Sequence, residues 1–335
     1  MQNFSSQATG GEVYEGKRAN EIAASERLHK SRKSSNSADP PTVTITSGGY
    51  SADISLHGGQ LLRLKAGEYD IVVPANAAKG AFAGSVLAPW PNRIAGATYS
   101  HQGQEYVLPV NEETTSSRLH GLLFDVDLTV TTQTNSEAQL RGRLEASAGY
   151  PFPLDITVTY QVAADRGLSC TLHARYEPDS DSAPPIPAPF GAGFHPYLTA
   201  AGANLDECRL QLPAHTVAVT KPNGQVITRQ QVDGPFDLTD GPLLAHRQID
   251  HAFTDLPAEG WRAELTHEPT GFSVRLSADT AWAQVYTAES IDRSGVAVEP
   301  QTCPPDAFNS GSDLILLQPG ESFHIEYAIE ANFVD

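Results

Sequence analysis

Apolar and polar residues alternate along most of the chain from Thr42 onward. A period of two is typical of strands that bury one face and expose the other. The clearest runs cover residues 156–162, 168–176, 261–265, 272–276 and 323–329. Short stretches that contain Gly separate the runs, at residues 101–104, 165–167, 222–224 and 318–320. The pattern therefore predicts antiparallel strands joined by tight turns.

No helical pattern longer than three turns is present after residue 42, and the 27 Gly and 24 Pro favour short strands and turns over long helices. A chain of 335 residues is long enough for two domains, but large all-β folds often use this length as one. We expect an all-β fold in which residues 42–335 form a single antiparallel β-sandwich of about twenty strands.

Residues 1–41 differ from the rest because they are polar and contain almost no large apolar side chains. We interpret them as a disordered N-terminal tail, with a marginal helix over residues 15–33 as the alternative. Such a segment has little apolar surface to bury, so we expect it to pack only weakly on the domain.

The composition narrows the class of protein. A net charge of −18 repels phosphate backbones, so nucleic acids and anionic membranes are not expected partners. Three cysteines without a C-x-x-C pair do not suggest a disulfide framework or a structural zinc site: Cys170, Cys208 and Cys303. No signal-peptide-like apolar region opens the chain, and no apolar run is long enough to span a membrane. We therefore expect a cytoplasmic protein.

Several common catalytic signatures are absent from the sequence, including GxGxxG, the Walker A loop, HExxH and GxSxG. The eleven histidines are scattered and show no clear metal-ligand spacing. We therefore expect neither a nucleotide cofactor nor a bound metal.

Five short segments interrupt the alternation with functional side chains among Gly and Pro, as loops on a rigid β scaffold often do. They are residues 88–96, 119–125, 193–197, 248–253 and 296–306.

These segments, taken in order, resemble the aldose 1-epimerase (mutarotase) family and its galactose-mutarotase-like members. The resemblance covers residues 42–333 and rests on Asn92-Arg-Ile-Ala-Gly96, Leu119-His-Gly121, Phe194-His195 and Val298-Glu-Pro300. It implies a large β-sandwich with an open sugar-binding cleft on one face. It also implies an isomerase that interconverts the α and β anomers of free aldohexoses of the glucose or galactose type, without cofactor or metal.

The resemblance also implies roles for single residues. Glu299 matches the general base, His195 the general acid at the ring oxygen, and His120 a second histidine that orients the sugar. Arg93 and Asp250 match residues that bind sugar hydroxyls. For each of them an ordinary structural role remains the alternative, most of all for Asp250, whose local match is the shortest. The Gly-Phe-His-Pro-Tyr sequence around His195 departs from the galactose-type pattern, which leaves the sugar preference open.

Trp282, Gln284 and Tyr286 share one face of a predicted strand. An aromatic ring there would stack on the apolar face of a pyranose, so we predict that Trp282 and Gln284 contact the substrate. A place in the sandwich core is an equal alternative for Trp282 and the favoured one for Tyr286.

Two other functions stay open. A hexose-6-phosphate mutarotase would need cations around the phosphate, for which Arg63, Arg118 and Arg293 are candidates. A non-catalytic sugar-binding module on the same fold is the other alternative. The sequence decides neither the preferred sugar nor whether the protein is a monomer or a dimer.

We finally expect Arg93, His120, His195, Asp250 and Glu299 to converge on one cleft. The side chains of Glu299 and His195 should lie farther apart than a direct hydrogen bond, because a sugar ring must fit between them.

Overall fold

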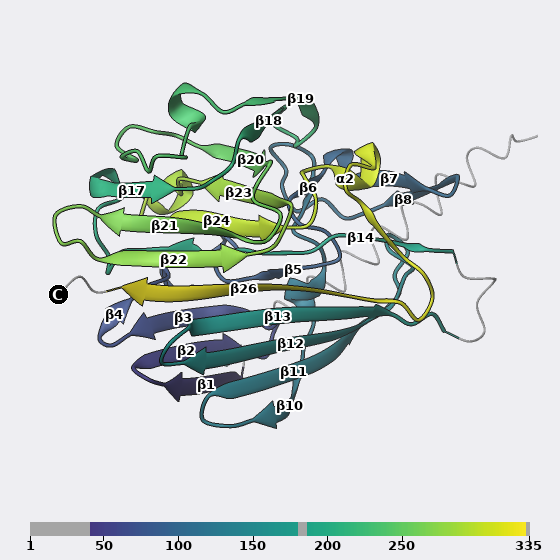
Figure 1. The fold of residues 1–335 in the computed structure, drawn as a ribbon. Coiled ribbons are helices and arrows are strands. Elements are labelled where there is room, and N and C mark those ends of the chain that lie inside the picture. The colour runs from purple at the N-terminus through teal and green to yellow at the C-terminus, as the bar shows by residue number, and fades with distance from the viewer. Residues whose placement is uncertain (1–40, 180–185, 333–335) are drawn as a thin grey trace, which may run out of the picture. The chain divides into compact units, whose positions relative to one another are not determined.

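The computed structural model describes residues 41–179 and 186–332. The predicted tail, residues 1–41, lies outside these ranges except for its last residue. The first strand begins at Thr42, where the alternation begins. Almost all regular structure is antiparallel strand, so the predicted all-β class is confirmed (Figure 1).

An eight-stranded antiparallel sheet spans the domain. Its order is β10 (Thr129–Gln133), β11 (Glu137–Leu144), β12 (Leu154–Ala163), β13 (Gly167–Tyr176), β26 (Ser322–Asn332), β22 (Ser273–Ala278), β21 (Trp261–His267) and β17 (Cys208–Gln211). The alternating sequences form its longest strands, and their inward residues are buried while their outward residues are polar.

Two further sheets cover the inner face of this sheet. A four-stranded sheet packs against β11, β12 and β13; it contains β1 (Thr42–Ser47), β2 (Tyr50–Ser55), β3 (Leu61–Ala66) and β4 (Tyr69–Asp70). A second eight-stranded sheet contains β19 (Val226–Gln231), β18 (Thr216–Thr220), β20 (Asp250–Thr254), β23 (Trp282–Tyr286), β24 (Val296–Gln301), β15 (Gly193–Phe194) and β5 (Val86–Leu87), with β16 (Tyr197–Leu198) paired to β24. One continuous apolar core joins all three sheets, which is the predicted sandwich in a single domain.

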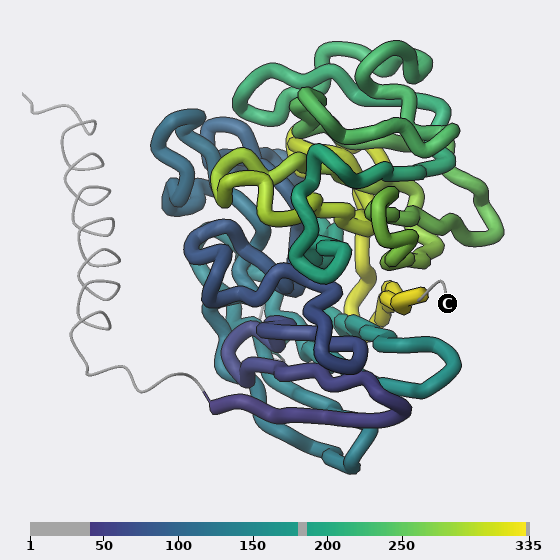
Figure 2. Tube along the Cα trace, turned by 90° about the vertical axis from the view of Figure 1, so that its left-hand side faces the viewer, coloured from purple at the N-terminus to yellow at the C-terminus, as the bar shows by residue number. Residues whose placement is uncertain are grey.

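Figure 2 shows how the chain order maps onto this domain. The N-terminal strands, in purple, and the green segments around β18 and β19 lie at opposite ends. Three short strand pairs complete the fold: β6 (Arg93–Ile94) with β9 (Arg118–Leu119), β7 (Thr98–His101) with β8 (Gln104–Val107), and β14 (Ala188–Phe190) with β25 (Ile315–Leu317). The described helices are single turns: η1 (Ala95–Ala97), η2 (Leu123–Asp125), η3 (Leu205–Glu207), η4 (Gly234–Phe236), η5 (Glu289–Ile291) and α2 (Ala307–Ser310).

The β6–β9 pair brings two of the candidate segments together. Gly121 forms a parallel bridge with Ala88, and its φ of +72° lies in the left-handed region. A Cβ at Gly121 would lie 2.1 Å from the backbone oxygen of Ala88. Only glycine fits there without moving the backbone, so Gly121 fixes the path of the chain directly after His120.

Gly121→Ala should therefore destabilise the protein by more than about 2 kcal/mol, because it adds both a steric clash and backbone strain. Gly103→Ala is a matched control: its φ is +79°, but nothing lies within 4 Å of the added Cβ. We expect that control to cost only about 1 kcal/mol, the usual effect of placing a side chain at such a φ. Urea unfolding of both variants measures the difference, and equal losses would contradict the close approach at Gly121.

Candidate active site

Glu299 lies on β24, where every residue is buried. Alternation along the strand directs Ala297, Glu299 and Gln301 to one face, while Val298 joins the main core on the other. Gln284 on the neighbouring β23 is the direct cross-strand partner of Glu299. Only 2% of Glu299 is exposed, so its carboxyl group is held on a rigid sheet and largely removed from water.

His195 lies between β15 and β16, which both pair with β24. Gly193 is the partner of Gln301 and Tyr197 is the partner of Ala297, so the register places His195 across from Glu299. Its Nε2 atom is 3.4 Å from Oε1 of Glu299. The expected separation by a sugar ring is therefore wrong for this structure: neighbouring strands bring the two groups into contact.

The backbone of Asn92 fixes the ring of His120. The Asn92 N–H donates to Nδ1 of His120 at 3.2 Å, and the His120 N–H donates to the Asn92 carbonyl at 2.9 Å. A neutral imidazole whose Nδ1 accepts a hydrogen bond carries its proton on Nε2. The His120 ring also contacts the ring of His195, with centroids 5.0 Å apart. His120 thus adds a second imidazole, with an N–H donor, beside the first.

The environment of these groups favours their neutral forms. Burial, together with the negative charge of Asp250, raises the pKa of Glu299 well above its ordinary value, although Gln301 and Arg93 oppose the shift. Burial lowers the pKa of His195 to about 4. Burial, His195 and Arg93 lower the pKa of His120. Burial thus disfavours the ionised form of Glu299 and the protonated forms of both histidines.

A polar cavity of about 240 Å³ is formed next to this cluster, between β6, the β18–β19 turn, β20 and β23. Arg93, Asp250 and Gln284 line it together with Asn92 and Lys221, whereas Glu299, His195 and His120 are not among its lining residues. The amide of Gln284 donates to Asp250 at 2.6 Å. Because both Arg93 and Asp250 act electrostatically on Glu299, the five expected residues lie in one region. Their roles in catalysis and binding stay predictions.

Glu112 is a site residue that the sequence reasoning missed. Its carboxylate accepts two hydrogen bonds from Arg93, at 2.7 Å each to Nε and Nη2. The pair holds the guanidinium at the edge of the cavity and leaves Nη1 free of Glu112. Glu112 belongs to a polar turn 19 residues away, where no local pattern marks it. Lys221 and Gln301 were missed in the same way.

Trp282 does not present an open aromatic surface. Its side chain is 1% exposed, its Nε1 donates to Asp313 at 2.9 Å, and Arg229 lies over its ring at 4.6 Å. A sugar reaches this ring only if Arg229 moves, so contact between Trp282 and substrate stays a prediction. Tyr286 is partly buried and packs on a small cluster with Tyr197.

The arginines considered for a phosphate lie elsewhere. Arg63 is paired with Asp70, and Arg293 with Asp206 and Glu289. Arg118 is buried, with its guanidinium 5.4 Å from the ring centroid of Phe124. None of these three arginines lines the cavity. Its cationic lining residues are Arg93 and Lys221.

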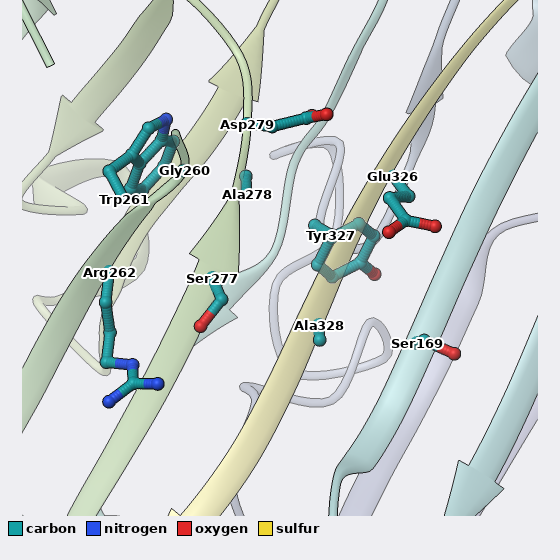
Figure 3. Close-up of a pocket in the computed structure, with 10 residues that line it drawn as sticks. All are labelled: Ser169, Gly260, Trp261, Arg262, Ser277, Ala278, Asp279, Glu326, Tyr327 and Ala328. Carbon is teal, nitrogen blue, oxygen red and sulfur yellow. The ribbon is translucent and has the colours of Figure 1, made fainter. Parts of the chain in front are cut away.

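A larger cavity of about 450 Å³ lies on the eight-stranded sheet that contains β13, β26, β22 and β21 (Figure 3). None of the predicted site residues lines it. Ser169, Ala328 and Ser277 lie side by side on β13, β26 and β22, and Arg262 follows on β21. Small side chains in the middle of a sheet of longer ones create this hollow.

The described residues contain no group of three or more His, Cys, Asp or Glu side chains arranged to hold a metal ion. The three cysteines are free and buried. None of the described helices has the length and apolar character that a bilayer crossing requires.

Comparison with known proteins identifies relatives of this chain. The model of the aldose 1-epimerase family matches residues 41–330. YihR of Escherichia coli K12, an uncharacterized protein, is 38% identical over an alignment of 294 residues that covers 86% of this chain and 92% of YihR. Human galactose mutarotase is 26% identical over 277 residues, 73% of this chain and 77% of that protein. Among solved structures, the GalM/aldose epimerase homologue of C. elegans has a TM-score of 0.78 at 19% identity and matches 89% of this chain and all of that one, which shows a common fold.

The burial of Glu299 leads to a prediction about stability. Because its pKa is higher in the folded than in the unfolded protein, raising the pH above the ordinary Glu range favours the unfolded state. Glu299→Gln removes this ionisation, so it should stabilise the protein at pH 8 by about 1 kcal/mol, the usual scale of a single substitution. The gain should shrink toward pH 4.5. Urea unfolding at both pH values measures it, and a variant that is less stable at pH 8 would show that the ionised carboxylate is well accommodated.

Proposed function

Because the chain belongs to the aldose 1-epimerase family, we propose that it interconverts the α and β anomers of free aldohexoses of the glucose or galactose type. It is an isomerase that acts on a sugar. The observation that carries the proposal is the contact between Glu299 and His195, a buried acid–base pair next to a polar cavity.

In the proposed reaction, Glu299 removes the proton from the anomeric hydroxyl while His195 gives a proton to the ring oxygen. The bond between C1 and the ring oxygen breaks, and C1 becomes an aldehyde. After rotation about the C1–C2 bond, the ring oxygen attacks the other face of C1. His195 takes back its proton and Glu299 returns the other to O1, so the enzyme ends in its starting state.

The reactive form of the pair carries one proton. With that proton on Glu299, the carboxyl group cannot accept a proton from the anomeric hydroxyl and the neutral His195 has none to give to the ring oxygen through Nε2. With the proton on His195, both transfers are possible. The negative charge of an ionised Glu299 only 3.4 Å away favours the imidazolium form of His195. The two forms are therefore tautomers of one coupled pair, and substrate binding next to the pair selects the reactive one.

The cavity offers polar groups of both kinds for sugar hydroxyls. Arg93 is a donor and Asp250 is an acceptor. His120 does not line the cavity itself, but its Nε2–H is a further donor beside His195. Gln284, already bonded to Asp250, has a buried amide oxygen without a protein partner among the described residues. We propose that these four residues bind the hydroxyls, and that Trp282 contacts the sugar after a movement of Arg229.

A second candidate is a mutarotase of hexose 6-phosphates, and Lys221 is the observation that favours it. Its ammonium group hydrogen-bonds Gln225 at 3.1 Å on the turn that borders the cavity. One lysine beside an already paired Arg93 is a weak site for a dianion, so we place the free sugar first. A non-catalytic sugar-binding module is disfavoured because both the acid and the base are present.

The proposal is tested by following the anomerisation of freshly dissolved α-D-glucose, α-D-galactose and glucose 6-phosphate by polarimetry or NMR exchange. Wild type should accelerate a free sugar well above the spontaneous and buffer-catalysed rate. Glu299→Gln and His195→Asn should each lower kcat by about 10²-fold or more, since each removes one partner of the proton transfer. Arg93→Lys should mainly raise KM. Wild-type rates in Glu299→Gln would exclude it as the base and point to His120 or Asp250.

The pKa shifts also predict the pH dependence of kcat. Below about pH 4 both groups of the pair are protonated, so the rate should rise as the pH increases through the lowered pKa of His195. It should fall again when the pair loses its last proton, at the raised pKa of Glu299. The profile should thus be a broad bell or plateau that includes neutrality. A sharp decline between pH 8 and pH 6 would contradict the order of these two ionisations.

A further inference from the structure

Gln301 lies two residues after Glu299, on the same face of β24. It is completely buried, and its Nε2 donates a hydrogen bond to Oε2 of Glu299 at 2.9 Å. Oε1 of the same carboxyl group is the atom that approaches His195. The two oxygens of Glu299 therefore have different partners.

The neighbouring strands leave room for this contact. Gln301 is paired with Gly193 on β15 and with Trp282 on β23. A Cβ at Gly193 would lie 3.1 Å from Cγ of Gln301, so the absence of a side chain at Gly193 accommodates the glutamine. The amide oxygen of Gln301 is buried without a partner among the described residues. Buried polar atoms are nearly always paired, and among the described residues this amide is paired only through its N–H₂ donor.

We propose that Gln301 is a positioning residue that binds Oε2 of Glu299 and thereby leaves Oε1 as the oxygen that exchanges the proton. The inference rests on the function proposed above. An amide N–H₂ group can only donate, so it stabilises the ionised carboxylate, which can only accept. It also prevents rotation of the carboxyl group, which would turn the reacting oxygen away from the substrate.

Other groups around Glu299 set its charge balance. The carboxylate of Asp250, from β20, disfavours ionisation, whereas Arg93, from β6, favours it. His195 is in direct contact with the carboxyl group of Glu299. Tyr197 of β16, whose phenol is neutral, also lies near this carboxyl group. Gln301 is therefore the neutral donor that acts directly on the carboxylate, while the guanidinium of Arg93 is paired with Glu112.

The test uses two replacements of nearly the same size as glutamine. Gln301→Met removes the donor, and Gln301→Glu replaces it with a second carboxyl group, which should disfavour a charge on Glu299 even more. The full-length protein is labelled with ¹³C at the side-chain carboxyls of glutamate, and the Glu299 signal is assigned by its loss in Glu299→Gln. An NMR titration without substrate then gives the ionisation midpoint of Glu299.

We expect the midpoint to rise by about one pH unit in Gln301→Met, the scale of one hydrogen bond to a charged group. It should rise further in Gln301→Glu. Kinetics are measured with the sugar that the anomerisation assay shows to be a substrate. There, kcat should fall by about 10-fold in Gln301→Met while KM changes by less than about 3-fold. The alkaline limb of the pH profile should move to higher pH together with the midpoint. The control is Gln211→Met, at an exposed glutamine of β17 that donates a hydrogen bond to the backbone oxygen of Thr239. It should change neither the midpoint, nor kcat, nor the pH profile.

An unchanged or lowered midpoint in Gln301→Met overturns the proposal, and so does a uniform loss of kcat at every pH without a shift of the limb. If the methionine variant fails to fold, Gln301→Leu, which also lacks the donor group, takes its place in the titration, and an unchanged or lowered midpoint there overturns the proposal as well. The titration needs no substrate, so it remains decisive even if no sugar is turned over. In that case the proposed function fails, while the role of Gln301 toward Glu299 is still measured.

Discussion

The pairing of β24 with β15, β16 and β23 is the constraint on which the site depends. Its register places Glu299 opposite Gln284 on one side and across from His195 on the other. A carboxyl group in this position cannot escape to solvent, because strands lie on both sides and the core lies beneath. The sandwich thus imposes an unfavourable environment on an ionised group, and the chemistry of the site follows from how neighbouring side chains relieve it.

The sequence predicted the fold well because the relevant information is local. Each long strand buries one face, so a period of two is visible without knowledge of its partners. The residues proposed for the site were also accessible, since Glu299, His195, His120 and Arg93 each lie in a short segment that resembles a family pattern. This success reflects motifs of a few residues, each readable independently of the rest of the chain.

Register and side-chain pairing between distant segments were not accessible. The contact of His195 with Glu299 depends on two strand pairings that join residues 98 to 108 positions apart. Glu112 carries no mark in its polar turn, and Gln301 looks like any strand-end glutamine until the direction of its amide is known. The burial of Trp282 under Arg229 likewise depends on an arginine of β19, a strand that β18 and β20 separate from β23 in the same sheet. These features arise from three-dimensional packing, which local patterns do not encode.

The ion pair between Arg93 and Glu112 changes what the cavity can recognise. A guanidinium whose charge is neutralised by its own carboxylate offers directed hydrogen bonds but little net attraction for anions. We therefore expect the cavity to distinguish ligands by the geometry of their hydroxyl groups more than by their charge, although the protein as a whole carries −18. Affinity for an uncharged sugar in such a cavity depends on stereochemistry and is nearly independent of ionic strength.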